Sequence, residues 1–148
     1  MNDKFSFAPF RFGAPQLLFF VMAVVLSLPA NASKDYWSDI ANNIIRHVND
    51  AQSFYANGDS KAAKRAIIQA YFGEFEDKKM EAAMRMELGA KHTYQVERLF
   101  SGMRKAINKG AEKISVTEAA IVIRKVITRD ARLLDKAGIA PEVFKVNQ

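Results

Sequence analysis

After residue 35, apolar residues recur at steps of three and four, the spacing that gives an amphipathic helix one buried face. The first such stripe stops at Asn57-Gly58, and Ser38 is placed as its N-cap. Its members are Trp37, Ile40, Ala41, Ile44, Ile45, Val48 and Ala51. A second helix is expected to begin at Asp59 or Ser60, and its many alanines indicate a close approach between helices.

The middle of the chain is predicted to bend and then to resume its helical spacing. Gly73 weakens the second stripe, so a break is expected between Gly73 and Asp77. Two further helices are predicted before Gly89 and before Gly110. Their apolar positions are Met80, Ala83, Met84 and Leu88 in one, and Val96, Leu99, Phe100, Met103 and Ile107 in the other.

The last predicted helix has signals at both ends. Ser115 and Glu118 have the spacing of a capping box, and Gly138 followed by Pro141 is typical of a helix C-terminus. The buried face between them comprises Ala119, Val122, Ile123, Val126, Ile127, Leu133 and Leu134. Because the connections are short, consecutive helices are expected to be antiparallel. The sequence therefore predicts an all-α fold, an antiparallel four- to five-helix bundle.

The segment before this bundle has the three-part pattern of a secretory signal peptide. Lys4 and Arg11 precede an apolar run at residues 17–28, and Pro29-Ala30-Asn31-Ala32 supplies small residues at the cleavage site. A bilayer span needs about 20 apolar residues, more than this run contains. We expect residues 1–32 to be a signal peptide cleaved near Ala32, and residues 33–148 to form one helical periplasmic domain. An uncleaved anchor is the alternative.

The composition and net charge limit the classes of partner that are expected. Removing two bases and one acid with the leader from 22 and 16 leaves 20 bases and 15 acids, a net charge of +5. No second apolar segment resembles a span, so the cleaved chain is not expected to be an integral membrane protein. Aromatic and basic residues are not interleaved in the manner of a base-stacking surface, and nucleic acid is not an expected partner. The chain has no cysteine, which excludes disulfides and thiolate metal sites.

Catalysis is not expected. The sequence contains no glycine-rich phosphate loop, no nucleophile elbow and no His-Glu-x-x-His pair. Its two histidines, His47 and His92, are far apart in the chain and give no local constellation.

The candidate chemistry lies in a stretch where acids alternate with aromatic residues. Glu74, Glu76, Asp77 and Glu81 fall within eight residues, and Glu97 follows on the next predicted helix. In a regular helix Glu74, Asp77 and Glu81 would share one face. Carboxylate oxygens suit iron and other hard cations, and helical bundles build metal sites from inward-facing carboxylates. His92, about one turn before Glu97, would add an imidazole.

Two other interpretations stay open at this point. Acids beside Lys78, Lys79 and Arg85 are also typical of a solvated helix face with weak ion pairs. Met80, Met84 and Met86 offer thioethers that suit Cu(I), although a methionine stripe is equally typical of core packing.

The same stretch resembles the N-terminal periplasmic domain of the bacterial high-affinity iron permease family. The resemblance covers about residues 36 to 108 and depends on the order and spacing of several short elements. These are Tyr55-x-x-Gly58-Asp59, Ala62-Ala63, Ala70-Tyr71-Phe72-x-x-Phe75-Glu76, Met80-Glu81 and Glu97-x-x-Phe100. The permeases move iron through membrane helices that carry Arg-Glu-x-x-Glu motifs, and this chain has neither such helices nor that motif.

The resemblance therefore implies a detached periplasmic domain that binds, presents or senses iron, or that docks onto a membrane iron permease or a periplasmic iron-handling protein. Position by position, it points to Glu76, Glu81 and Glu97 as metal ligands, with Glu74 ranked lower because it lies beside the matching elements. Phe72, Phe75 and Phe100 would place apolar surface against these acids. A partly buried carboxylate needs a cation, a proton or a hydrogen-bond partner. A network with Arg85, Arg98 or Arg104 is the competing explanation of the acids.

Two functions follow as hypotheses. The first is a periplasmic accessory of iron uptake that binds iron without catalysis. The second is a non-catalytic interaction module that docks a membrane partner through an apolar and basic face, with copper handling through the methionines as a minor third.

Overall fold

The computed structural model describes residues 35–144, and helices account for nearly all of this range. The predicted signal peptide lies outside the described residues. The elements are α1 (Tyr36–Ala56), α2 (Ser60–Ile68), the π-helix η1 (Gln69–Glu76), α3 (Met80–Glu87), α4 (Ala90–Asn108), α5 (Lys113–Ala137) and the 3₁₀-helix η2 (Pro141–Phe144).

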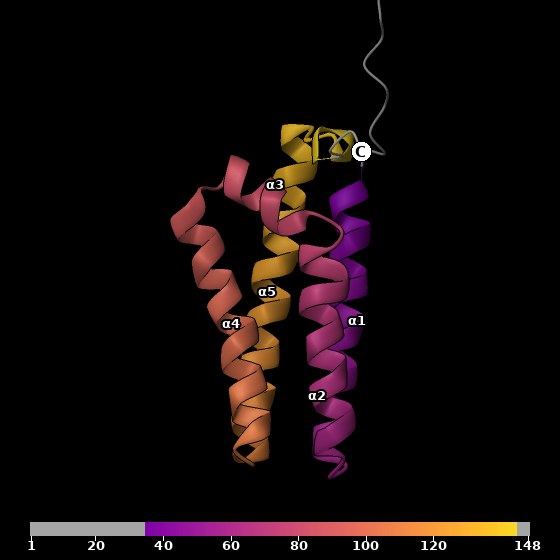
Figure 1. The fold of residues 1–148 in the computed structure, drawn as a ribbon, viewed down its shortest axis with the longest axis vertical. Helices are drawn as coiled ribbons and strands as arrows, with labels where there is room; N and C mark the ends of the chain where they lie inside the picture. The colour runs from indigo at the N-terminus through magenta and orange to yellow at the C-terminus, as the bar shows by residue number, and fades with distance from the viewer. Residues whose placement is uncertain (1–34, 145–148) are drawn as a thin grey trace, which may run out of the picture.

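Four long rods form the bundle, with the short α3 lying across one end (Figure 1). α1 packs against α2 and α5, and α4 packs against the same two helices, so the rods close a ring of four. The π-helix η1 continues α2 without a turn, and the two together make one rod. Consecutive rods run in opposite directions, which confirms the predicted antiparallel helical bundle.

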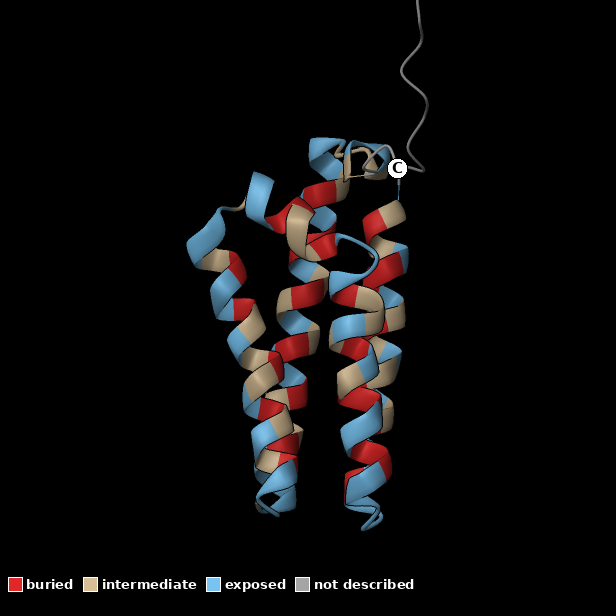
Figure 2. Cartoon of the chain, viewed as in Figure 1, coloured by how far each residue is buried: buried red, intermediate tan, exposed pale blue. Residues whose placement is uncertain are grey.

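One apolar core fills the space between the rods. Buried positions form a stripe along the inward face of each helix, and exposed positions cover the outside (Figure 2). The largest fully buried side chains are Trp37, Phe75, Ile44, Ile67, Met80, Met84, Met103, Ile123, Ile127, Leu134, Val48 and Val96. The periodicity of the sequence therefore identified most of the core, but in α5 (Lys113–Ala137) Val122 and Leu133, predicted on the buried face, are 43% and 42% exposed because the inward positions are Ala120, Ile123, Ile127 and Leu134.

Two of the predicted helix ends are confirmed. The side chain of Asp59 accepts a hydrogen bond from the backbone N–H of Ala62 at 2.8 Å and caps α2. Gly138 ends α5 with φ of 67°, a left-handed conformation that glycine adopts without steric cost.

Two other predicted caps are wrong. Ser38 lies inside the first turn of α1, which begins at Tyr36. α5 begins at Lys113, so Ser115 and Glu118 lie within the helix and form no capping box. At this start of α5 the ammonium group of Lys113 donates to the carbonyl of Ala56 at 2.6 Å, a contact that joins the helix to the end of α1.

The start of α1 is capped from the opposite end of the chain. Asp135 of α5 accepts hydrogen bonds from the backbone N–H groups of Trp37 and Ser38, at 2.8 and 3.0 Å, and from the Ser38 hydroxyl at 2.5 Å. The Trp37 indole N–H donates to the carbonyl of Ile139 at 2.8 Å. These contacts, which we call the Asp135 clamp, satisfy backbone donors that no local side chain reaches.

The predicted break between Gly73 and Asp77 takes a different form. The chain stays helical through Gly73, as a π-helix in which the N–H of Asp77 bonds to the carbonyl of Phe72 at 3.1 Å, five residues earlier. The turn follows at residues 77–79, where Lys79 has φ of 66°. Within residues 35–144, none of the helices combines the length and apolarity that crossing a bilayer requires.

Candidate functional site

Two of the predicted acids meet at one arginine. Glu81 of α3 and Glu97 of α4 both contact Arg85, whose Nη2 lies 3.2 Å from Oε1 of Glu97 and also donates to Oε1 of Glu81. The two carboxylate side chains are 20% and 24% exposed, whereas the Arg85 side chain is 55% exposed. One guanidinium thus faces two partly buried carboxylates, and one negative charge stays unbalanced within this trio.

The electrostatics of Glu97 reflect that imbalance. Burial raises the pKa of Glu97 above its ordinary value, and the neighbouring charge of Glu81 raises it further, while Arg85 acts in the opposite direction. Three arginines are expected from the sequence as competing partners, and Arg85 is the one that Glu81 and Glu97 contact.

Tyr71 lies within the electrostatic influence of the three acids named by the family resemblance, and Arg104 acts on it in the opposite direction. Burial raises the pKa of its hydroxyl, and the charges of Glu97, Glu76 and Glu81 raise it further in that order. The Tyr71 ring packs against Phe100 and Phe75, with centroids 5.6 and 5.9 Å away. Glu76 is exposed, and together with Glu97 it lines a groove of about 700 Å³ beside this aromatic cluster.

Glu74 is directed away from these acids, toward α1. Its Oε1 lies 4.0 Å from Nε2 of His47, and its Oε2 is buried without a hydrogen-bond partner. Asp77 is exposed beside Lys78, at 3.8 Å. The expectation that Glu74, Asp77 and Glu81 share a face is therefore wrong, because the wider π turn and the left-handed Lys79 break the regular helical spacing between them.

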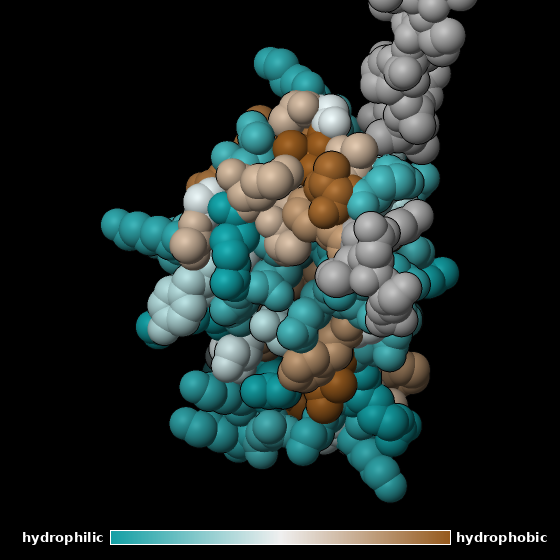
Figure 3. All heavy atoms as spheres, turned by 45° about the horizontal axis from the view of Figure 1, so that its top comes forward, coloured by the Kyte–Doolittle hydropathy of each residue, from teal (hydrophilic) through white to brown (hydrophobic). Residues whose placement is uncertain are grey.

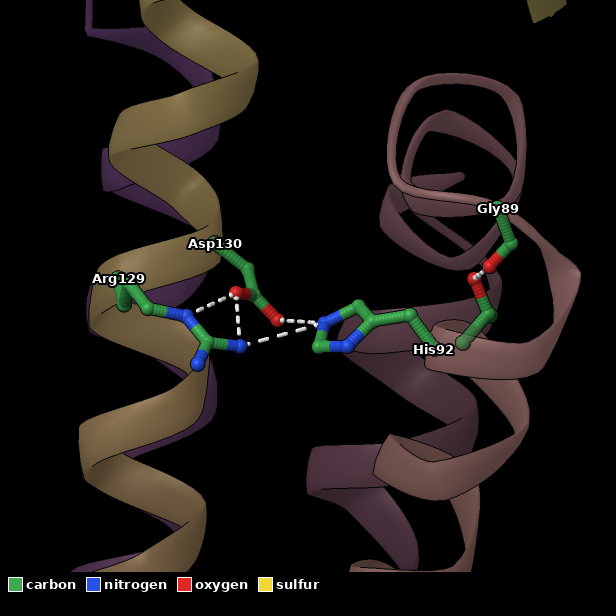
Figure 4. A network of polar contacts seen from close by, with 5 residues as sticks. Gly89, His92, Arg129 and Asp130 are labelled. Atoms are coloured by element: carbon green, nitrogen blue, oxygen red, sulfur yellow. Dashed lines mark hydrogen bonds and ion pairs between the residues drawn. The ribbon is translucent and has the colours of Figure 1, made fainter.

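His92 belongs to another polar network, on α4 and α5 (Figure 4). Its Nε2 lies 2.7 Å from Oδ2 of Asp130, a side chain with no exposed surface. Arg129 binds the other oxygen of Asp130 at 2.6 Å, which pairs the buried charge on both sides. The sequence contains a signal for this network, because Asp130 occupies an inward position between Ile127 and Leu134 on the core face of α5.

The methionines considered for copper are not brought together as a set. Met80 and Met84 are fully buried in the core, and Met86 is 57% exposed. Among residues 35–144, no three histidine, aspartate or glutamate side chains are grouped so as to hold a metal ion. Arg85 lies between Glu81 and Glu97, whereas Glu76 lines the groove with Glu97 and Tyr71.

Comparisons with known proteins add no assignment, since no family model, curated protein or solved structure matches this chain.

A pH dependence of stability follows from the Glu97 environment. Its carboxyl group binds a proton more tightly in the folded than in the unfolded chain, so the folded state holds more protons between the two pKa values. Stability therefore falls as the pH rises through that interval. We expect the melting temperature of wild type, relative to Glu97→Gln, to fall across this interval in a pH series. Glu118→Gln, an exposed control on α5, should retain the wild-type dependence, and parallel curves for wild type and Glu97→Gln would contradict the assignment.

Proposed function

We propose that this protein is a periplasmic accessory of iron uptake, which binds or presents iron through clustered carboxylates without catalysing a reaction. The observation that carries the proposal is that Glu81 and Glu97 lie close enough to share Arg85, while Glu76 lines the same groove as Glu97. Arg85 occupies the position between the two carboxylates, as the competing arginine network predicts, so iron must displace it to bind. Periplasmic location is inferred from the signal-peptide pattern, and the link to iron comes from the family resemblance.

The donor chemistry fits iron as a cargo ion. Carboxylate oxygens are hard ligands, and the unbalanced negative charge at Glu81 and Glu97 favours a cation. For iron to bind, Arg85 must be displaced from the two carboxylates. Because its side chain is more than half exposed, it can leave the two carboxylates and be solvated outside the site at low cost. In this scheme Arg85 holds the carboxylates together until iron replaces it.

Partners follow from the same reasoning. A domain that resembles part of an iron permease but lacks the transporting helices is suited to deliver iron to a membrane permease, or to exchange it with another periplasmic iron-handling protein. The copper alternative has weaker support, because two of its three thioethers are enclosed in the core.

The proposal predicts that the purified domain binds ferrous or ferric iron through these acids. We expect the double variant Glu81→Gln, Glu97→Gln to bind iron at least tenfold more weakly than wild type in a calorimetric titration, because both central donors lose their charge. Glu76→Ala combined with Glu81→Ala should also weaken binding. Glu87→Gln, an exposed acid at the end of α3, is the matched control and should bind like wild type. Equal affinity in wild type and both double variants would remove these residues from the site.

A second function has one specific observation in its favour. The outer face of α5 carries four exposed bases at helical spacing, Lys125, Arg129, Arg132 and Lys136, beside the exposed Leu133. A basic face with apolar members suits a docking module for a membrane partner. Under this function the wild-type protein shows no binding in the iron titration.

A further inference from the structure

The groove beside Tyr71 has features that iron binding does not use. It runs along α4, opposite the end of α2 and the start of η1, and its volume of about 700 Å³ is in the range of small-molecule sites. Apolar side chains gather in patches on a surface that is otherwise polar (Figure 3). The groove is lined by both apolar and basic side chains, which favours a ligand that has an apolar part and a negative charge.

Aromatic rings form the walls of the groove. Tyr71 and Phe100 lie at its base, with ring centroids 5.6 Å apart, and Phe100 is buried. Phe72 and Tyr94 stand at the rim and are 49% and 57% exposed. Large aromatic side chains left in water on both sides of a groove offer stacking surface to a planar ligand.

The α4 side of the groove is basic and lacks acidic partners. Arg98, Arg104 and Lys105 line it, and among residues 35–144 no carboxylate lies within ion-pair distance of any of the three. Arg98 lies over the Tyr94 ring, with its guanidinium carbon 5.9 Å from the centroid. Arg104 is partly buried at the groove and lies within the electrostatic influence of Tyr71, so its guanidinium is placed to contact an anion there.

We propose that this groove binds a small planar aromatic acid. The ring lies against Tyr71 and Phe72, near Phe100, and the acidic group is held by Arg104 and Lys105. Glu76 and Glu97 also line the groove and repel additional negative charge, which favours a ligand with one anionic group. The site shares these two acids with the proposed iron site but requires neither Glu81 nor Arg85, so it does not depend on iron binding.

Gly102 provides a way to block the groove without weakening the helix. It lines the groove within α4, and a Cβ added there meets no atom within 4 Å. Leucine is a far better helix former than glycine, so Gly102→Leu fills the groove while favouring the helix. Arg104→Gln removes the proposed anion-binding charge, and Arg46→Gln on α1 is the control that removes an exposed base elsewhere.

The probes are naphthalene-2-carboxylate and its neutral counterpart, 2-naphthalenemethanol, titrated into ¹⁵N-labelled protein and followed by NMR. We expect the carboxylate to bind at least tenfold more tightly than the alcohol, with shifts confined to α2, η1 and α4. Arg104→Gln should remove this preference, Gly102→Leu should abolish binding of both probes, and Arg46→Gln should bind like wild type. Absence of saturable binding, equal affinities for the two probes, or unchanged binding in Gly102→Leu would each overturn the proposal.

Discussion

Replacing Phe75 with alanine is expected to lower the free energy of unfolding by about 3–5 kcal/mol, as for other fully buried aromatic residues. The Phe75 side chain has no exposed surface, and its ring packs against Tyr71 and Phe100, with centroids 5.9 and 5.4 Å away. Truncation removes this contact area and leaves a cavity where the π-helix meets the core. Equilibrium urea denaturation followed by circular dichroism measures the change.

Phe72 is the matched control for Phe75. It has the same side chain and lies in the same π-helix, but it is 49% exposed and its ring contact is with the neighbouring Tyr71. Phe72→Ala should therefore change the free energy of unfolding by less than about 1 kcal/mol, in line with surface substitutions. Similar losses in the two variants would show that the register of the π-helix differs from the one described.

Replacing Asp135 with alanine is expected to lower the free energy of unfolding by about 2–4 kcal/mol, because hydrogen bonds to a charged group contribute about 1.5–3 kcal/mol each and are not additive. The variant loses the bonds from Trp37 and Ser38, and with them a negative charge at the positive end of α1. Thermal and urea denaturation both report this loss. Hydrogen exchange should also speed up in the first turn of α1.

The variant Asp35→Ala is the control that distinguishes the Asp135 clamp from an ordinary local N-cap. Asp35 occupies the N-cap position of α1, but its side chain makes no capping hydrogen bond. Asp35→Ala should change stability by less than about 0.5 kcal/mol, as expected for a surface site without such a role. If Asp35→Ala costs as much as Asp135→Ala, the first turn of α1 is capped locally and the clamp has no energetic importance.

The fold followed from the sequence because most of its determinants are periodic and local. The buried stripes from Trp37 to Ala51 and from Val96 to Ile107 could be identified from spacing alone, and Asp59 and Gly138 marked helix ends with their own side chain or backbone. Ser38 and Ser115 misled the cap assignment for the opposite reason. Both helices begin before the predicted cap, and the contacts at these starts come from residues distant in the chain: Asp135 with Ser38, and Ala56 with Lys113.

The site was predicted less completely. Glu81 and Glu97 come together as the sequence suggested, and Arg85 is one of the three arginines foreseen as partners. Glu74 and His92 are directed elsewhere, to His47 and to Asp130. A π-helix has no recognised pattern of apolar residues, so the rotation that it gives to Glu74 could not be read from spacing. The partner of His92 lies 38 residues away, beyond the reach of any local rule.

The Asp135 clamp also sets the order in which the native fold can be completed. Asp135 lies 98 residues after Trp37 in the chain. During synthesis, α1 is therefore complete long before the residue that caps its first turn. Until Asp135 is present, the backbone amides in the first turn of α1 have no carboxylate to accept their hydrogen bonds. A fragment truncated before Asp135 should consequently be susceptible to proteases at the first turn of α1, whereas a chain that extends through Gly138 contains both partners of this contact.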